Sequence, residues 1–159
     1  MTVMLLANVG NRDVGVTREI PIPGEVNPIW NEKASRRAMG DAILENWEAC
    51  RPHLSLPIIG KAVDHIREQE GAIDRVILIA SDQSGVAGVS DRHLAQDTIK
   101  LAHVVARLLE ETWGMPKRSI TIWTVTQNPA DYGGMQAFFR ERLSALRAQE
   151  PKGEAYLEV

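Results

Sequence analysis

The stretch RVILIAS, residues 75–81, determines the fold class, because it is a continuous run of apolar and β-branched residues without polar alternation. A strand of this composition is covered on both faces, which is typical of the central strands of parallel sheets. The stretches TVMLLANV at residues 2–9 and SITIWTV at residues 119–125 repeat the pattern. We therefore expect three buried strands, with residues 155–159 beginning a fourth.

Between these strands the apolar residues recur at helical spacing. This periodicity predicts four helices, over residues 31–50, 57–69, 91–112 and 129–148. Asn128 directly precedes the last of them, and asparagine is a favoured capping residue, so we expect it to cap that helix. Strands that alternate with helices in this rhythm form a parallel sheet. The sequence therefore predicts a single α/β domain over residues 1–159, with a Rossmann-like, mostly parallel sheet and helices on both faces.

The composition is that of a globular chain with a weak negative charge. Of the 159 residues, 44% are hydrophobic and 25% are charged, and the formal net charge is −3 at pH 7. The single cysteine, Cys50, cannot form an internal disulfide, and no paired Cys or His spacing indicates zinc. No stretch has the length of a membrane span or the pattern of a signal peptide. We expect a cytoplasmic protein without membrane contact, metal or other cofactor, which holds any anionic ligand with local donors.

Several well-known enzyme motifs are absent from the sequence. Residues 10–15, GNRDVG, lack the G-x-G-x-x-G spacing of dinucleotide-binding enzymes, and there is no Walker loop or G-x-S-x-G nucleophile motif. None of the four histidines lies in a local catalytic motif, and only His93 lies close to a loop that could bind a ligand. We therefore assign no catalytic residue and disfavour a nicotinamide or nucleoside-triphosphate enzyme.

Polar loops follow the predicted strands at the ends where parallel α/β sheets bind their ligands. These loops lie at residues 10–13, 81–90 and 126–131, and the first two contain glycine. Backbone N–H groups of such turns suit phosphates and base edges without a net positive charge. Arg12 could pair with a phosphate, and the Asn11 and Gln83 amides carry the donor and acceptor that an adenine edge requires. The candidate ligand-binding residues are Gly10, Asn11, Arg12, Asp13, Ser81, Asp82, Gln83 and Ser84.

Three segments at these positions resemble the CARF family, the CRISPR-associated Rossmann fold. LLANVGNRDV at residues 5–14 is similar to the first strand of that family and its ligand-facing turn. DRHLAQDT at residues 91–98 is similar to the segment after the central strand, where an Asp-Thr pair precedes an apolar helix. NPADY at residues 128–132, followed by MQAFFRERL, is similar to a third family pattern before an aromatic-bearing helix. The three occur in the family's order and together span most of the chain.

The resemblance implies a regulatory domain of a type III CRISPR antiviral response that senses cyclic oligoadenylate. It also implies a homodimer, because family members pair isologously and hold one ring across the two-fold axis. We expect cyclic tetra-adenylate rather than hexa-adenylate as this ring. Family members commonly carry a following effector domain, and their next strand leads into a threonine- and glycine-rich loop. Since the chain stops at Val159, we expect the effector domain and that final strand-loop region to be missing.

Two other functions stay open on the sequence alone. Some CARF proteins are ring nucleases, which position a ribose 2′-hydroxyl in line with the adjacent phosphate. That chemistry depends on positioning and charge stabilisation more than on a dedicated base. The fold class also admits a generic Rossmann-like module. Such a module would bind a mononucleotide instead of a ring, or would bind only a protein partner.

Overall fold

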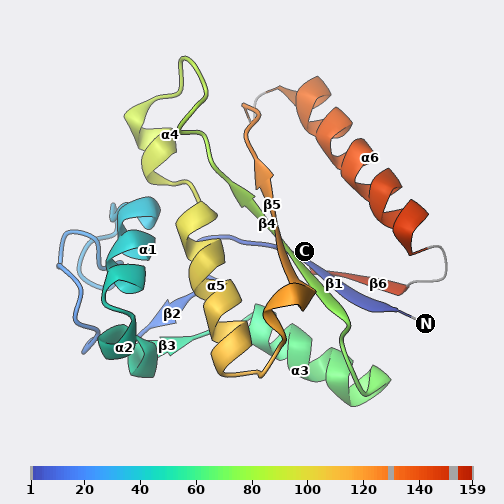
Figure 1. The fold of residues 1–159 in the computed structure, drawn as a ribbon. Helices are drawn as coiled ribbons and strands as arrows, with labels where there is room; N and C mark the ends of the chain where they lie inside the picture. The colour runs from blue at the N-terminus through green and yellow to red at the C-terminus, as the bar shows by residue number, and fades with distance from the viewer. Residues whose placement is uncertain (1, 129–130, 151–153, 159) are drawn as a thin grey trace.

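The computed structural model describes residues 2–128, 131–150 and 154–158. Its main sheet has four parallel strands in the order β5-β4-β1-β6 (Figure 1). The predicted parallel sheet is confirmed, and the strand expected at the end of the chain pairs with β1, apart from Val159, which lies outside the described residues. The strands are β1 (Val3–Asn8), β4 (Arg75–Ser81), β5 (Ile120–Val125) and β6 (Glu154–Glu158).

The order of the strands reverses once, at β1. The chain places β4 and then β5 on one side of β1, and it returns to add β6 on the other side. In open α/β sheets such a reversal leaves a crevice at the carboxyl ends of the two strands that flank it, and ligands bind there. In this sheet the switch point lies between β1 and β6, so the loop that follows β1 leaves the sheet at that crevice.

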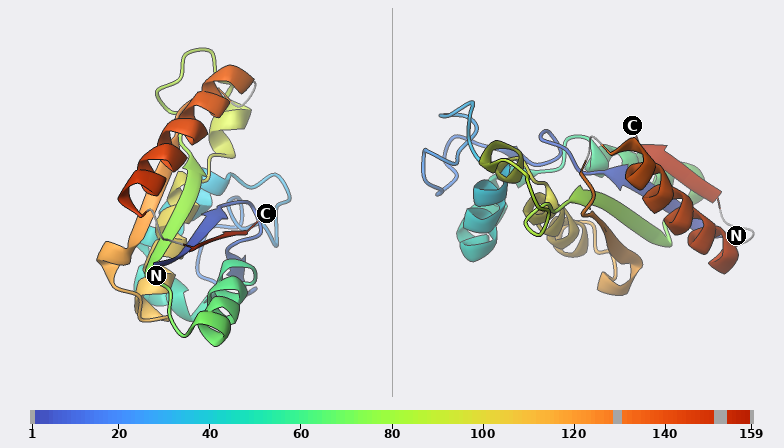
Figure 2. Two further views of the ribbon diagram at one scale, coloured as in Figure 1. Left: turned by 90° about the vertical axis from the view of Figure 1, so that its right-hand side faces the viewer. Right: turned by 90° about the horizontal axis from the view of Figure 1, so that it is seen from above.

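Helices cover both faces of the sheet, as the sequence predicted (Figure 2). On one face, Leu5 and Leu78 pack in a core with α1, α3 and α5. On the other face, Met4 and Ile77 pack in a second core with α6. The alternation of side chains along β1 and β4 therefore places apolar residues on both faces. The helices are α1 (Arg36–Glu45), α2 (Trp47–Cys50), α3 (Ile59–Glu70), α4 (Asp91–Ala95), α5 (Ile99–Glu111) and α6 (Tyr132–Gln149), with short 3-10 turns η1 (Arg51–His53) and η2 (Lys117–Ser119).

A long excursion separates β1 from α1. Its first part, β2 (Gly15–Val16), pairs antiparallel with β3 (Leu54–Ser55) in a separate two-stranded sheet. Residues 17–35, all of which the structure describes, contain no helix or strand. In Figures 1 and 2 this excursion lies beside α1, on the side of the molecule opposite the N-terminus.

Two of the predicted helices begin later than expected because a different residue caps them. The helix expected from residue 31 begins at Arg36, where the Ser35 hydroxyl accepts the backbone N–H of Ala38 at 3.1 Å. The last helix begins after Asp131, whose carboxylate accepts the N–H of Gly134 at 3.0 Å, so the prediction that Asn128 caps it is wrong. Pro129, expected in its first turn, lies outside the described residues.

The helix expected over residues 91–112 is interrupted. It forms as α4 and α5, which are separated by residues 96–98. Its apolar spacing continues through the break, so the cause is not local. Asp97 and Thr98 instead bond to the end of β4, as the next subsection describes.

The packing of α1 against α5 generates a stability prediction at Gly40. A Cβ on Gly40 would lie 2.5 Å from Lys100 Cβ and 2.9 Å from the Lys100 carbonyl carbon, so backbone would have to move. Alanine is the better helix former by about 1 kcal/mol, but overpacking of this kind costs about 1–3 kcal/mol. We expect Gly40→Ala to lower the free energy of unfolding in urea.

A second helical glycine provides the matched control. At Gly133 in α6 the nearest atom to an added Cβ is Asp131 Oδ1 at 3.6 Å, an ordinary contact. Gly133→Ala should therefore leave stability unchanged or raise it. If Gly40→Ala is as stable as the wild type, the close approach of α1 and α5 is wrong.

Candidate functional site

The structure brings the two candidate segments to the same edge of the sheet. Asn8 of β1 is in register with Ile79 of β4, and the Val9 N–H donates to the Ile79 carbonyl at 2.8 Å. The Asp82 N–H donates to the Val125 carbonyl at 2.9 Å, which ties the end of β5 to the same edge. Residues 10–13 and 81–84 therefore leave the carboxyl ends of neighbouring parallel strands.

The loop after β1 is a tight turn closed by Asp13. The Gly10 N–H donates to Asp13 Oδ2 at 2.5 Å, and the Asp13 N–H is 3.5 Å from the Gly10 carbonyl. The Asp13 side chain points inward and the residue is only 4% exposed, whereas Asn11 and Arg12 are both exposed. The turn thus presents Asn11 and Arg12 to solvent, and Asp13 holds its shape.

Burial makes the ionised form of Asp13 unfavourable. Desolvation raises the pKa of this carboxyl, and the hydrogen bond from the Gly10 N–H offsets part of the rise. The second oxygen, Oδ1, is buried and has no hydrogen-bond partner among the described residues. The folded loop therefore favours a neutral side chain at this position.

The end of β4 is tied to the start of α5 by a reciprocal pair of hydrogen bonds. The Ser81 N–H donates to Thr98 Oγ1 at 3.0 Å, and the Thr98 N–H donates to Ser81 Oγ at 3.1 Å. Each side-chain hydroxyl thus satisfies the backbone donor of the other residue. These bonds fix where the chain leaves the sheet and where it returns.

A buried carboxylate, Asp97, anchors the rest of this loop. Asp97 Oδ2 accepts the Gln83 N–H at 2.8 Å and a bond from Arg37 Nη1 at 3.2 Å, and its side chain is only 2% exposed. The same Arg37 nitrogen lies 3.1 Å from Asp82 Oδ1. One guanidinium in the first turn of α1 therefore pairs with two carboxylates, Asp82 just after β4 and Asp97 just before α5.

The Asp82 carboxylate is stabilised in its ionised form. Ser84 donates to Asp82 Oδ1 with its hydroxyl at 2.7 Å and with its N–H at 3.1 Å. These bonds, the Ser84 hydroxyl first, together with Arg37 hold the pKa of Asp82 below its usual range. Asp82 thus carries a negative charge, and all of these bonds reach its Oδ1 oxygen.

Gln83 lies in the interior instead of presenting its amide to solvent. It is 4% exposed, and its side-chain Nε2 donates to the Gln127 carbonyl at 3.3 Å. This contact joins the loop after β4 to the segment after β5. Of the residues chosen on this loop, Ser81 and Asp82 are half-buried and Ser84 is exposed.

Sequence reasoning did not select Arg37, Asp97 and Thr98 as parts of the site. A signal for two of them was present, since the Asp-Thr pair at residues 97–98 is part of the segment that resembles the CARF family. Nothing in the sequence indicated that Arg37 belongs to the site, because an arginine in a first helical turn is ordinarily solvated. His93 lies on α4 and is exposed, with no described contact to a candidate residue.

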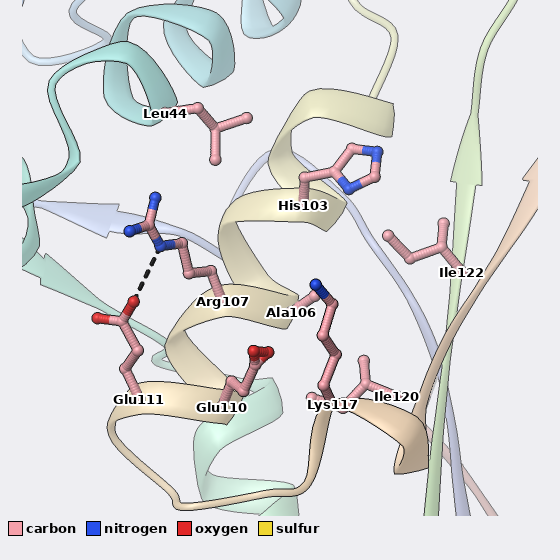
Figure 3. Close-up of a pocket in the computed structure, with 9 residues that line it drawn as sticks. All are labelled: Leu44, His103, Ala106, Arg107, Glu110, Glu111, Lys117, Ile120 and Ile122. Atoms are coloured by element: carbon pink, nitrogen blue, oxygen red, sulfur yellow. Dashed lines mark hydrogen bonds and ion pairs between the residues drawn. The ribbon is translucent and has the colours of Figure 1, made fainter.

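A cavity lies away from this edge. It has a volume of about 770 Å³ and opens between α5, the end of α1 and β5 (Figure 3). Lys117 of η2, which precedes the amino end of β5, reaches into it beside Ile120, and His103 and Arg107 of α5 line its other wall. None of the candidate ligand-binding residues lines this cavity.

The described residues hold no cluster of three or more His, Cys, Asp or Glu side chains that could ligate a metal ion. In the same part of the chain, every helix is too short or too polar to cross a lipid bilayer. Comparison with known proteins gives no match, whether to a protein-family model, to a curated protein or to a solved structure.

The buried carboxyl of Asp13 generates a pH-dependence prediction. Its pKa is raised in the folded state, so its contribution to stability is present below the unfolded pKa and is lost as the pH rises through the folded pKa. Asp13→Asn removes this titration and keeps an oxygen for the Gly10 N–H. We expect this variant to melt about 2–4 °C above the wild type at pH 7, the shift that about 1 kcal/mol gives at this chain length, with the gap closing toward pH 3.

Asp13→Ala separates the charge from the hydrogen bond. It removes the acceptor of the Gly10 N–H, and an unmade bond of this kind costs about 1–3 kcal/mol. Its melting temperature should therefore fall below that of Asp13→Asn at every pH. A destabilisation of Asp13→Asn at pH 7 equal to that of Asp13→Ala would contradict the account of a costly buried charge.

Proposed function

We propose that this chain senses cyclic oligoadenylate, with one ring held across the two-fold axis of a homodimer at the carboxyl edge of the sheet. The observation that carries the proposal is the position of the turn at residues 10–13. It follows β1 at the topological switch point, where open α/β sheets bind their ligands. The three segments that resemble the CARF family supply the identity of the ligand.

The exposed side chains of this turn have the chemistry that an oligoadenylate requires. The Arg12 guanidinium can donate two parallel hydrogen bonds to a phosphate, and the Asn11 amide carries both a donor and an acceptor for an adenine edge. Both are exposed. The formal net charge of −3 means that the anionic ring is held by such local donors rather than by an overall positive field.

The loop after β4 supports the site by being fixed in place. Asp97, Arg37 and Thr98 bond its backbone and side chains from three directions, as described above. A loop ordered before binding loses less conformational freedom when the ligand arrives. In this proposal Ser84, the exposed residue among the four candidates on this loop, contacts the ring, and Gln83 maintains the connection to the segment after β5.

A homodimer follows from the symmetry of the ligand. A cyclic oligoadenylate with an even number of nucleotides has a two-fold axis, and an isologous pair of protomers has one as well. Two copies of the 10–13 turn then supply two Arg12 guanidinium groups on opposite sides of one ring. A single turn would contact only half of its phosphates.

Replacement of Arg12 tests this assignment. We expect Arg12→Ala to weaken binding of cyclic tetra-adenylate about tenfold to hundredfold in calorimetry, the effect of about 1.5–3 kcal/mol that a charge-assisted hydrogen bond supplies. The matched control is Arg118→Ala. Arg118 is also exposed, but it lies in η2 at the amino end of β5, on the opposite edge of the sheet.

The control variant should bind the ring as the wild type does. Equal losses in Arg12→Ala and Arg118→Ala would show that the arginines act through overall charge, and the site assignment would be wrong. Arg107 is a poorer control, because it stacks on Trp47 at 4.3 Å and bonds Glu111 at 2.9 Å, so its loss would also disturb packing.

A further inference from the structure

Trp30 is exposed to solvent, whereas the other three tryptophans are buried or half-buried. The Trp30 side chain is 60% exposed, whereas Trp47 and Trp123 are 3% and 7% exposed. Trp113 is half-buried, and its indole N–H donates to Asp64 at 2.8 Å. A large aromatic surface left open in this way is typical of a binding contact rather than of the core.

The backbone that carries Trp30 is rigidly anchored. Asn27, only 1% exposed, accepts the Ile29 N–H with its side chain at 3.0 Å and the Trp30 N–H with its carbonyl at 3.1 Å. The Asn31 N–H also donates to the Asn27 carbonyl, at 2.9 Å. The Trp30 ring is therefore presented on a fixed turn, although residues 17–35 contain no regular element.

A cation lies over the same ring. The Arg18 guanidinium carbon is 5.2 Å from the Trp30 ring centroid, which is within the range of a cation–π contact. Arg18 is itself exposed, so its N–H groups remain accessible to an anion. Proteins that bind single-stranded nucleic acids combine an aromatic ring with nearby cationic side chains such as arginine. A base stacks on the ring, and a phosphate binds the cation.

The residues that follow the Trp30 turn in the chain bond to the segments around the candidate site. Five residues later, the Ser35 hydroxyl donates to the Ala95 carbonyl of α4 at 3.1 Å. Two residues beyond that, Arg37 bonds Asp82, just after β4, and Asp97, just before α5. Figures 1 and 2 show the excursion next to α1, which these contacts join to the carboxyl edge of the sheet.

We infer that Trp30 stacks on an adenine of the bound cyclic oligoadenylate and that Arg18 contacts an adjoining phosphate. This inference rests on the proposed function and adds a base-recognition element to it. Stacking uses the π face of the base and leaves its edge free, so it complements hydrogen bonding by Asn11. The turn at residues 10–13 then holds the phosphates, and the Trp30 turn holds the bases.

Intrinsic fluorescence and calorimetry with cyclic tetra-adenylate test the inference together. We expect the ring to quench the emission of the wild type, because Trp30 is the most exposed of the four tryptophans. Trp30→Ala should bind the ring about tenfold or more weakly, and Trp30→Phe should keep most of the affinity because a phenyl ring still stacks. Arg18→Gln should weaken binding and flatten its dependence on salt.

Ile58→Ala is the matched control for loss of an exposed apolar side chain. Ile58 is 41% exposed, and it precedes α3. This variant should bind the ring as the wild type does, and circular dichroism should show that all variants are folded. An equal loss of affinity in Ile58→Ala would overturn the specific role of Trp30.

The outcomes separate this inference from the proposed function. If the wild type binds the ring and Trp30→Ala binds it equally well, stacking is wrong and the proposed function stands. If Trp30→Ala no longer self-associates in the absence of the ring, its loss of affinity comes from a lost dimer contact, and stacking is wrong. If the wild type does not bind the ring at all, the proposed function is wrong and the stacking is overturned with it.

Discussion

The arrangement of the carboxyl edge depends on one buried carboxylate. Asp97 accepts the Gln83 N–H and an Arg37 nitrogen while only 2% of its side chain is exposed. Its charge is tolerated there because Arg37 compensates it, and loss of one partner of such a pair leaves an unpaired charge in the interior. Through this one side chain, α1, the loop after β4 and the segment before α5 are held in a single arrangement.

The carboxyl edge therefore has two parts, the fixed loop after β4 and the turn after β1, which exposes side chains to solvent. The loop after β4 is occupied by its own hydrogen bonds, as the burial of Gln83 and the Ser81–Thr98 pair show. The turn after β1 is also closed, by Asp13, but it leaves Asn11 and Arg12 in solvent. Ligand contacts in the proposed function therefore come mainly from β1 and the excursion, and β4 supplies the rigid support.

The sheet could be predicted from the sequence, but the local geometry of its edge could not. Continuous apolar runs identify β1 and β4, because strands buried on both faces require them. The similar run at residues 119–125 correctly predicts a strand, but β5 lies at the edge of the sheet and is largely half-buried rather than buried. The break between α4 and α5 escaped prediction because apolar spacing continues across it, and its cause is the bonding of residues 97–98 to Ser81 of β4 and to Gln83 after it, which are distant in sequence. For the same reason Gln83 was predicted to face a ligand, although the structure buries its amide against Gln127.

In the proposed function, two copies of this edge enclose one cyclic oligoadenylate. Analytical ultracentrifugation of the chain with and without cyclic tetra-adenylate, with the nucleotide followed by its absorbance, measures that claim most directly. We expect the ring to sediment with a species of twice the chain mass, at one ring per two chains, and linear tetra-adenylate to bind more weakly. A chain that remains monomeric at tens of micromolar with the ring in excess, or that binds linear and cyclic forms equally, would contradict it.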